Sequence, residues 1–325
     1  MKHAEGFRWI ASATAMSLVL LGSFLSPAHS QSEFLRGGRM PYDAFDRLAK
    51  TDIDVHGGAI HVAFAPGDIA LPKDRILDWV RASARAVATY YGRFPVKSLK
   101  LLLVPVDGRR VRGGTTWSYR GAAIRVLVGR DSSEEDLRRD WIMVHEMVHL
   151  ALPEMERRYD WLSEGLAVYI EPIARVQAGD LSAQDVWQAM MRDMPKGLPQ
   201  AGDRGLDNTG SWGRKYWGGA MFCLLADIEI RKRTSNRLGL RDAMRGVIAA
   251  GGSHEVYWSI ERIFAVADRA VGVDVLADLH KQMGSEPVAP DLDRLWVDLG
   301  LTMRGSVLGF DDTAPLAEIR KEITR

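Results

Sequence analysis

The stretch DWIMVHEMVHLALP, residues 140–153, places two histidines and a glutamate in an otherwise apolar run. The spacing of the apolar residues is typical of a buried helix, and Pro153 marks its end. Burying titratable groups without partners is costly. Either His145, Glu146 and His149 satisfy one another within the core, or they bind a ligand.

The spacing of these three residues favours a metal ion. Residues four apart lie on one face of a helix, one turn above the other, so His145 and His149 can bind the same ion. Glu146 lies beside them, where it can contact a metal-bound water without being a ligand. This is the H-E-x-x-H arrangement of two zinc ligands and a general base. We therefore predict a Zn²⁺ site with Glu146 as a catalytic residue.

A catalytic zinc ion needs a third protein ligand and an open fourth position. Position 155, six residues beyond His149, holds methionine where one class of zinc peptidases has histidine. Glu154 and Glu156 follow the helix too closely to fold back. A turn between two helices can bring Glu164, in the segment WLSEG, against the histidines, and Glu171 is the alternative ligand.

The segments HEMVH and WLSEGLAVY together resemble the gluzincin signature of the aminopeptidase N and glycyl aminopeptidase families. The resemblance covers roughly residues 95–250 through short motifs, and it is nearest in kind to small peptidase-MA-like proteins. It implies a thermolysin-like zincin core, zinc as the cofactor, hydrolysis of peptides or proteins, and Glu164 as the third ligand.

A third segment, KYWGGAMFCLLADIEIRKRT, resembles the Y-x-K-G-A segment of the same families, with glycine at position 218 in place of lysine. The family's tyrosine donates a hydrogen bond to the oxyanion, a role that the resemblance assigns to Tyr216. A phenol suits this role because it is a neutral donor at pH 7. His254 is a rival donor without a motif.

The chain departs from these families before the zinc helix. They carry a glutamate there that binds the free amino group of the substrate, whereas this chain has RGGTTWSY with Thr115 and Thr116. Threonine cannot neutralise an ammonium ion, so aminopeptidase and endopeptidase activity both stay open. The strand AAIRVLV, residues 122–128, is a candidate for pairing with an extended substrate, and it equally fits an ordinary sheet strand. Four aromatic residues are candidates either for lining a cleft or for packing: Trp117, Tyr119, Trp212 and Trp217.

The order of the elements predicts an α+β fold. A short lead-in, residues 31–50, is expected to pack loosely, and the zincin lobe to span residues 51–178. That lobe holds two strands that turn at Gly57–Gly58, a helix over residues 72–94, and the strands LKLLLVPV and GAAIRVLVG, the latter after a turn at Gly113–Gly114. Ser132 and Glu135 are expected to cap the histidine-bearing helix, and Asp160 the next one, which Pro172 kinks or stops. A helical lobe, residues 179–325, follows, with helices over residues 181–194, 214–234, 240–250, 254–271 and 273–283.

The first 30 residues predict export. A charged start, an apolar run over residues 9–25 and small residues at Ala28 and Ser30 are typical of a secretory signal peptide cleaved after Ser30. The protein is then periplasmic or secreted, without stable membrane insertion, and the alternative is an uncleaved membrane anchor. The single cysteine, Cys223, cannot form an internal disulfide and reads as a buried apolar residue.

Composition excludes other classes of partner. The 325 residues carry a formal charge of +1 and no long basic run, so nucleic-acid binding is not expected.

Two alternatives to a peptidase remain. One is an inactive, zinc-binding envelope protein, against which the intact Glu146 argues. The other is a zinc hydrolase of cell-wall amides.

Overall fold

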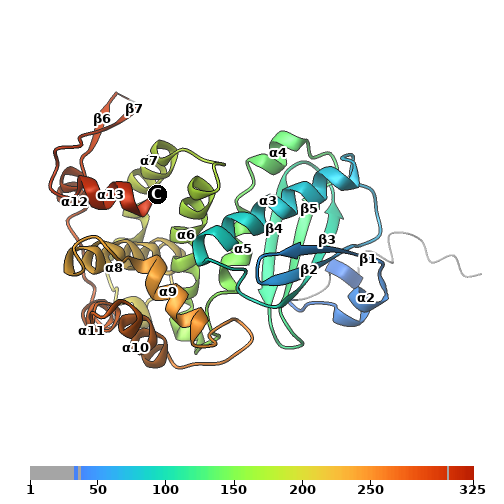
Figure 1. Ribbon diagram of the computed structural model, residues 1–325, viewed down its shortest axis with the longest axis horizontal. Helices are drawn as coiled ribbons and strands as arrows, with labels where there is room; N and C mark the ends of the chain where they lie inside the picture. The colour runs from blue at the N-terminus through green and yellow to red at the C-terminus, as the bar shows by residue number, and fades with distance from the viewer. Residues whose placement is uncertain (1–32, 36–37, 306) are drawn as a thin grey trace, which may run out of the picture.

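The computed structural model describes residues 33–35, 38–305 and 307–325, so the expected signal peptide lies outside the described residues. A five-stranded sheet flanked by helices is followed by a mostly helical part (Figure 1). This arrangement confirms the predicted α+β fold. The first part contains α2 (Tyr42–Arg47), β1 (Lys50–Val55), β2 (Gly58–Phe64), α3 (Lys73–Tyr91), β3 (Ser98–Val106), β4 (Val111–Trp117), β5 (Ala123–Gly129), α4 (Glu134–Arg138) and α5 (Ile142–His149).

The sheet has the strand order β1-β2-β3-β5-β4, with β2, β3 and β5 parallel and the two edge strands antiparallel to their neighbours. Side chains of a strand alternate between the two faces of its sheet. In β3, Leu101 and Leu103 accordingly join the main core with α3 and α5, whereas Leu102 and Val104 join a smaller core on the opposite face. Both faces of the central strands are therefore buried.

The expectation of a loose lead-in is wrong for the described part of that segment. Phe34, Met40, Tyr42 and Phe45 are at most 4% exposed and form the smaller core, with α2 lying against the sheet. Tyr42 also donates a hydrogen bond from its hydroxyl to the carbonyl of Gly121 at 2.8 Å. The local sequence does not reveal this packing, because the partners lie on strands that come later in the chain, among them Ala63, Leu102 and Ala123.

The histidine-bearing segment forms two short helices, not one. The capping box is made by Ser133 and Asp136, one residue later than expected, and it begins α4. The chain then turns at Asp140, whose carboxylate accepts hydrogen bonds from the backbone N–H groups of Ile142 and Met143, both at 3.0 Å. A carboxylate there satisfies N–H groups that have no partner within the helix. Asp140 therefore starts α5 in a new direction.

Two expectations about the sheet are also wrong. Gly113 and Gly114 do not form a turn; they lie within β4, beside a bulge between Val111 and Gly113. The strand AAIRVLV corresponds to β5, which lies between β3 and β4 and has no free edge for a substrate. The edge strand on that side of the sheet is β4.

The second part begins with α6 (Asp160–Gln177), which continues through Pro172 instead of stopping there. Asp160 makes no capping hydrogen bond; its carboxylate binds Lys215 at 3.0 Å. Residues 254–259, which were expected to begin a helix, are not helical. A hairpin of two short strands, over residues 301–304 and 307–310, was not predicted. The remaining elements are α7 (Ala183–Asp193), the π-helical turn η4 (Arg214–Gly218), α8 (Gly219–Arg233), α9 (Leu240–Ala249), α10 (Ile260–Val271), α11 (Leu276–Met283), α12 (Leu292–Asp298), β6 (Leu301–Arg304), β7 (Val307–Phe310) and α13 (Ala317–Ile323).

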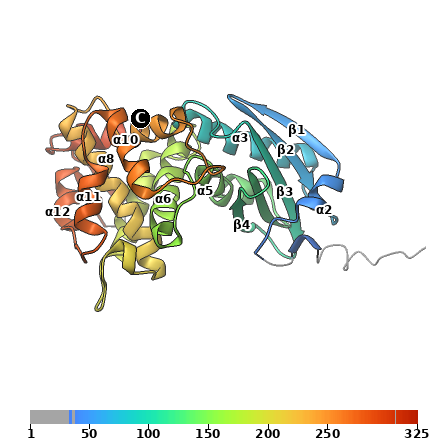
Figure 2. The ribbon, with the colours of Figure 1, turned by 90° about the horizontal axis from the view of Figure 1, so that it is seen from below.

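Helices α5 and α6 lie between the sheet and the C-terminal helices (Figure 2). Cys223 is buried, as expected. Among the described residues, no helix combines the length and the apolar character needed to cross a membrane.

Candidate metal centre and active site

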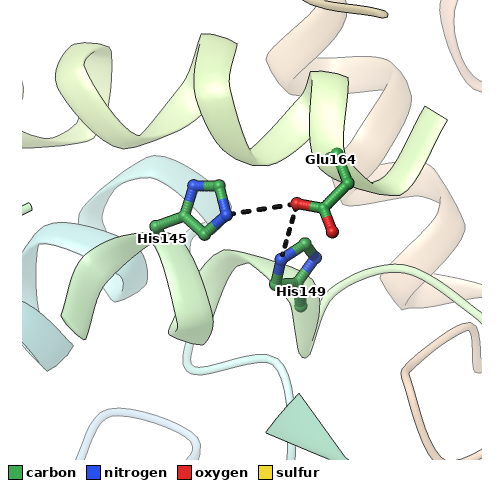
Figure 3. Close-up of side chains that lie close together, drawn as sticks. All are labelled: His145, His149 and Glu164. Atoms are coloured by element: carbon green, nitrogen blue, oxygen red, sulfur yellow. Dashed lines mark hydrogen bonds and ion pairs between the residues drawn. The ribbon is translucent and has the colours of Figure 1, made fainter. Parts of the chain in front are cut away.

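Helices α5 and α6 bring together the three side chains that the sequence predicts as metal ligands. His145 and His149 project from α5 toward Glu164 on the first turns of α6 (Figure 3). Their possible ligand atoms all lie within 4.8 Å of one another. The Oε2 atom of Glu164 is 3.3 Å from Nε2 of His145 and 3.6 Å from Nε2 of His149.

These distances fit a tetrahedral zinc ion. Ligand atoms held about 2.0–2.1 Å from one ion at tetrahedral angles lie roughly 3.3–3.4 Å apart. Two imidazoles and one carboxylate are also a donor set of catalytic zinc sites, in which the fourth position stays open. His145, His149 and Glu164 can therefore hold Zn²⁺ with little movement.

The surroundings favour the metal-binding form of His149. Burial, followed by the charge of His145, lowers the pKa of His149 to about 3, so the ring is neutral at pH 7. Its Nδ1 atom lies 2.9 Å from the hydroxyl of Ser163. A hydrogen bond from Nδ1–H to that hydroxyl leaves the lone pair of Nε2 directed at the site.

The ionised form of Glu164 is favoured as well. Burial acts to raise its pKa, but the contacts with His145 and His149 outweigh burial, and the pKa falls below its usual value. A carboxylate and two neutral imidazoles are the forms that bind a metal ion.

Glu146 lies on α5 beside the two histidines and lines the same pocket. It is 8% exposed, and burial raises its pKa to about 6 although a hydrogen bond from Thr116 acts in the opposite direction. The Thr116 hydroxyl donates to Oε2 of Glu146 at 2.6 Å. A buried carboxylate with a raised pKa suits general base catalysis near neutral pH.

The edge strand approaches Glu146 closely because residue 114 is glycine. A Cβ atom at this position would lie 2.5 Å from Cγ of Glu146 and 2.9 Å from Cγ2 of Ile142. Gly114 therefore allows β4 to pack directly on α5, which in turn brings Thr116 within reach of the carboxylate.

Tyr216 lies in the π-helical turn η4 and faces the same pocket. Its ring lies 6.5 Å from that of His145 at an interplanar angle of 14°, and it also stacks on Trp212 at 5.6 Å. Burial and then the charge of Glu164 raise the pKa of Tyr216 to about 12, so the hydroxyl is a neutral donor at pH 7.

Close packing of two helices holds this turn in place. A Cβ atom on Gly219, at the start of α8, would lie 2.0 Å from the carbonyl oxygen of Trp161 on α6. One on Gly165 would lie 2.2 Å from the carbonyl carbon of Gly219. Gly219 therefore permits the contact between α6 and α8 that places Tyr216 near Glu164.

Other sequence candidates lie elsewhere or play other parts. The carboxylate of Glu171 forms a buried ion pair with Arg175 at 2.8 Å, so it is engaged outside the group of converging ligand atoms. His254 does line the pocket, and its Nε2 atom lies 3.5 Å from Oε1 of Glu154. The roles of Thr116 and Ser163 were missed, because a single hydroxyl carries no motif.

The aromatic candidates divide into two groups. Trp212 is 60% exposed and stacks on Tyr216, so it lies at the rim of the site. Trp117 and Tyr119 instead donate hydrogen bonds to the carbonyls of Gly38 and Met40 and pack against the lead-in. Trp217 packs against the main core. Trp141, 50% exposed and edge-on to His145 at 5.3 Å, was not anticipated.

No family model and no curated protein matches the chain. Among solved structures, an aminopeptidase N family protein from Idiomarina loihiensis is similar over 79% of this chain and 50% of its own length, with a TM-score of 0.60 and 15% identity. An M1 zinc metallopeptidase from Deinococcus radiodurans aligns with 75% of this chain and 53% of its own, at 16% identity and a TM-score of 0.48. The chain thus spans about half the length of these proteins, and the first likeness shows a shared fold.

Proposed function

We propose that this protein is a zinc-dependent peptidase. One observation carries the proposal: the ligand atoms of His145, His149 and Glu164 converge in a pocket that Glu146 and Tyr216 also line. The shared fold with an aminopeptidase N family protein supports it. A purely structural zinc site would more often be closed by a fourth protein ligand.

Each residue has a definite part in the proposed reaction. His145, His149 and Glu164 would hold Zn²⁺, which when bound supplies a Lewis acid for the scissile carbonyl and lowers the pKa of a water molecule. Glu146 accepts the proton of the attacking water and passes it to the leaving amine. Tyr216 donates a hydrogen bond to the oxygen on which negative charge develops.

The pocket supports hydrolysis within peptides as well as at their ends. Thr116, which stands where an amine-binding glutamate is expected, directs its hydroxyl to Glu146. The substrate's amino group therefore finds no carboxylate at this position. Whether the enzyme releases single residues or cleaves internally follows from the products it forms.

The test uses residues 31–325, loaded with zinc and incubated with a defined peptide mixture that mass spectrometry reads out. Glu146→Gln should retain zinc and lose cleavage by at least a hundredfold, and Tyr216→Phe should retain zinc and lose about ten- to a thousandfold. Cleavage that survives Glu146→Gln would refute the mechanism. Hydrolysis of cell-wall peptides alone would support an amidase instead.

We also propose export through the N-terminal segment. The supporting observation is its charged, apolar and small-residue pattern. N-terminal sequencing of the protein from the cell envelope should find a chain that begins at Gln31. An intact Met1 would favour the anchored alternative.

A further inference from the structure

The edge strand β4 borders the candidate active site along its length. Gly114, Thr115 and Thr116 line the pocket, and β4 pairs with β5 on its other side. An extended peptide can add to such an edge through backbone hydrogen bonds. Arg110 directly precedes β4, four residues before Gly114.

A second hollow lies at the start of β4. Three arginines line it, Arg109, Arg110 and Arg139, together with Trp141. Trp141 borders this hollow, and its ring lies edge-on at 5.3 Å to the ring of His145, which lines the candidate active site. A peptide that continues along β4 from the candidate zinc site therefore reaches these arginines within three to four residues.

The accessible charge in this second hollow is positive. The side chains of Arg109, Arg110 and Arg139 are 64%, 78% and 77% exposed. Of the acidic groups that face them, Asp136 is 9% exposed and Glu135 is 45% exposed. A third carboxylate in this hollow belongs to Asp140, which accepts hydrogen bonds from the first N–H groups of α5.

The arginines also retain unused donors. Each guanidinium has five N–H groups. Arg109 directs two of its nitrogens to one oxygen of Asp136, at 2.9 and 3.1 Å, whereas Nε of Arg110 is 3.7 Å from the other oxygen. Arg139 is paired with Glu135 instead. Arg110 is therefore the least engaged of the three guanidinium groups and the most available to an incoming carboxylate.

The opposite end of β4 carries negative charge. Ser118, directly after the strand, donates a hydrogen bond to Oε1 of Glu154 at 2.6 Å. Glu154 is 49% exposed and lies 3.5 Å from His254, which lines the candidate active site. The carboxylate of Glu154 therefore lies beyond the end of β4, and the three guanidinium groups lie at its start.

We propose that the arginines form a carboxylate-binding subsite, so that the substrate lies antiparallel to β4 with its carboxyl side toward Arg110. This inference rests on the proposed peptidase function and names its substrate class. The preferred substrates are peptides with a carboxylate three to four residues after the scissile bond. The carboxylate belongs either to an acidic side chain or to the C-terminus of a short peptide.

The test uses calorimetry to measure the binding of peptides to the zinc-loaded Glu146→Gln protein, which should leave the peptides intact. The probe is an alanine heptapeptide with a central phenylalanine, made in three forms. One has a free C-terminus, one a C-terminal amide, and one a C-terminal amide after a final glutamate. Cleavage of the same peptides by the parent protein tests the peptidase function separately.

We expect one or both carboxylate forms to bind about fivefold more tightly than the neutral amide. Arg110→Gln should abolish the difference. Arg112→Gln, which changes an exposed arginine of the same strand outside the lining of this hollow, should preserve it. The form that shows the preference identifies the source of the carboxylate. Equal binding of all three forms, or equal loss in both variants, would overturn the subsite even if the peptides are cleaved.

Discussion

Replacing Gly114 by alanine should disable the proposed catalytic carboxylate of Glu146 while sparing the candidate metal ligands. The new Cβ atom would lie 2.5 Å from Cγ of Glu146. Because carbon atoms pack at about 3.5 Å, the glutamate or the strand must move by about 1 Å. A displacement of that size at a catalytic group can reduce the rate about a hundredfold, and overpacking of this kind costs roughly 1–3 kcal/mol of stability.

The assay compares peptide hydrolysis, zinc content and thermal unfolding of the parent and the variant. Gly113→Ala is a matched control, because nothing lies within 4 Å of a Cβ atom at that position. We expect Gly114→Ala to retain zinc, to melt several degrees lower and to hydrolyse peptides far more slowly. Full activity in Gly114→Ala, or an equal loss in Gly113→Ala, would show that the contact between β4 and Glu146 does not matter for catalysis.

Two further predictions concern pH and stability. The hydrogen bond from Thr116 lowers the pKa of Glu146, so Thr116→Val should raise that pKa and move the acid limb of the pH–rate profile to higher pH. Thr115→Val, which removes a hydroxyl bonded to a backbone carbonyl, should leave the profile in place. Asp203 and Arg214 form an ion pair at 2.8 Å with side chains 1% and 2% exposed, so Asp203→Asn should destabilise the protein by about 3–5 kcal/mol in urea unfolding. A decrease in the free energy of unfolding of less than about 1 kcal/mol would contradict the importance of this buried ion pair.

Local patterns in the sequence predicted much of the fold. The apolar run in β3 reflects burial on both faces of the sheet, and the helical spacing in α3 reflects burial on one face of the helix. The predicted grouping of His145 and His149 follows from helix geometry alone. The prediction of Glu164 as the third ligand assumed a turn between two helices, and the structure brings its carboxylate to the two histidines.

The features that were missed depend on partners far away in the chain. Gly114 reads as a turn residue, but its small size serves the contact with Glu146, 32 residues later. The lead-in reads as loose because the sheet face that buries Phe45 is built from later strands. Asp140 reads as part of a continuous helix, yet its carboxylate caps a new one. Sequence periodicity cannot report such contacts.

The zinc content of residues 31–325, measured beside the Glu164→Ala variant, tests the candidate metal centre directly. Glu156→Ala, which changes an exposed glutamate outside the group of candidate ligands, is the control. We expect one zinc ion per chain in the parent and the control, and loss or marked weakening of zinc binding in Glu164→Ala. Full zinc in Glu164→Ala would remove this residue from the ligand set. A parent protein that binds no zinc, even after zinc is added back, would contradict the central claim.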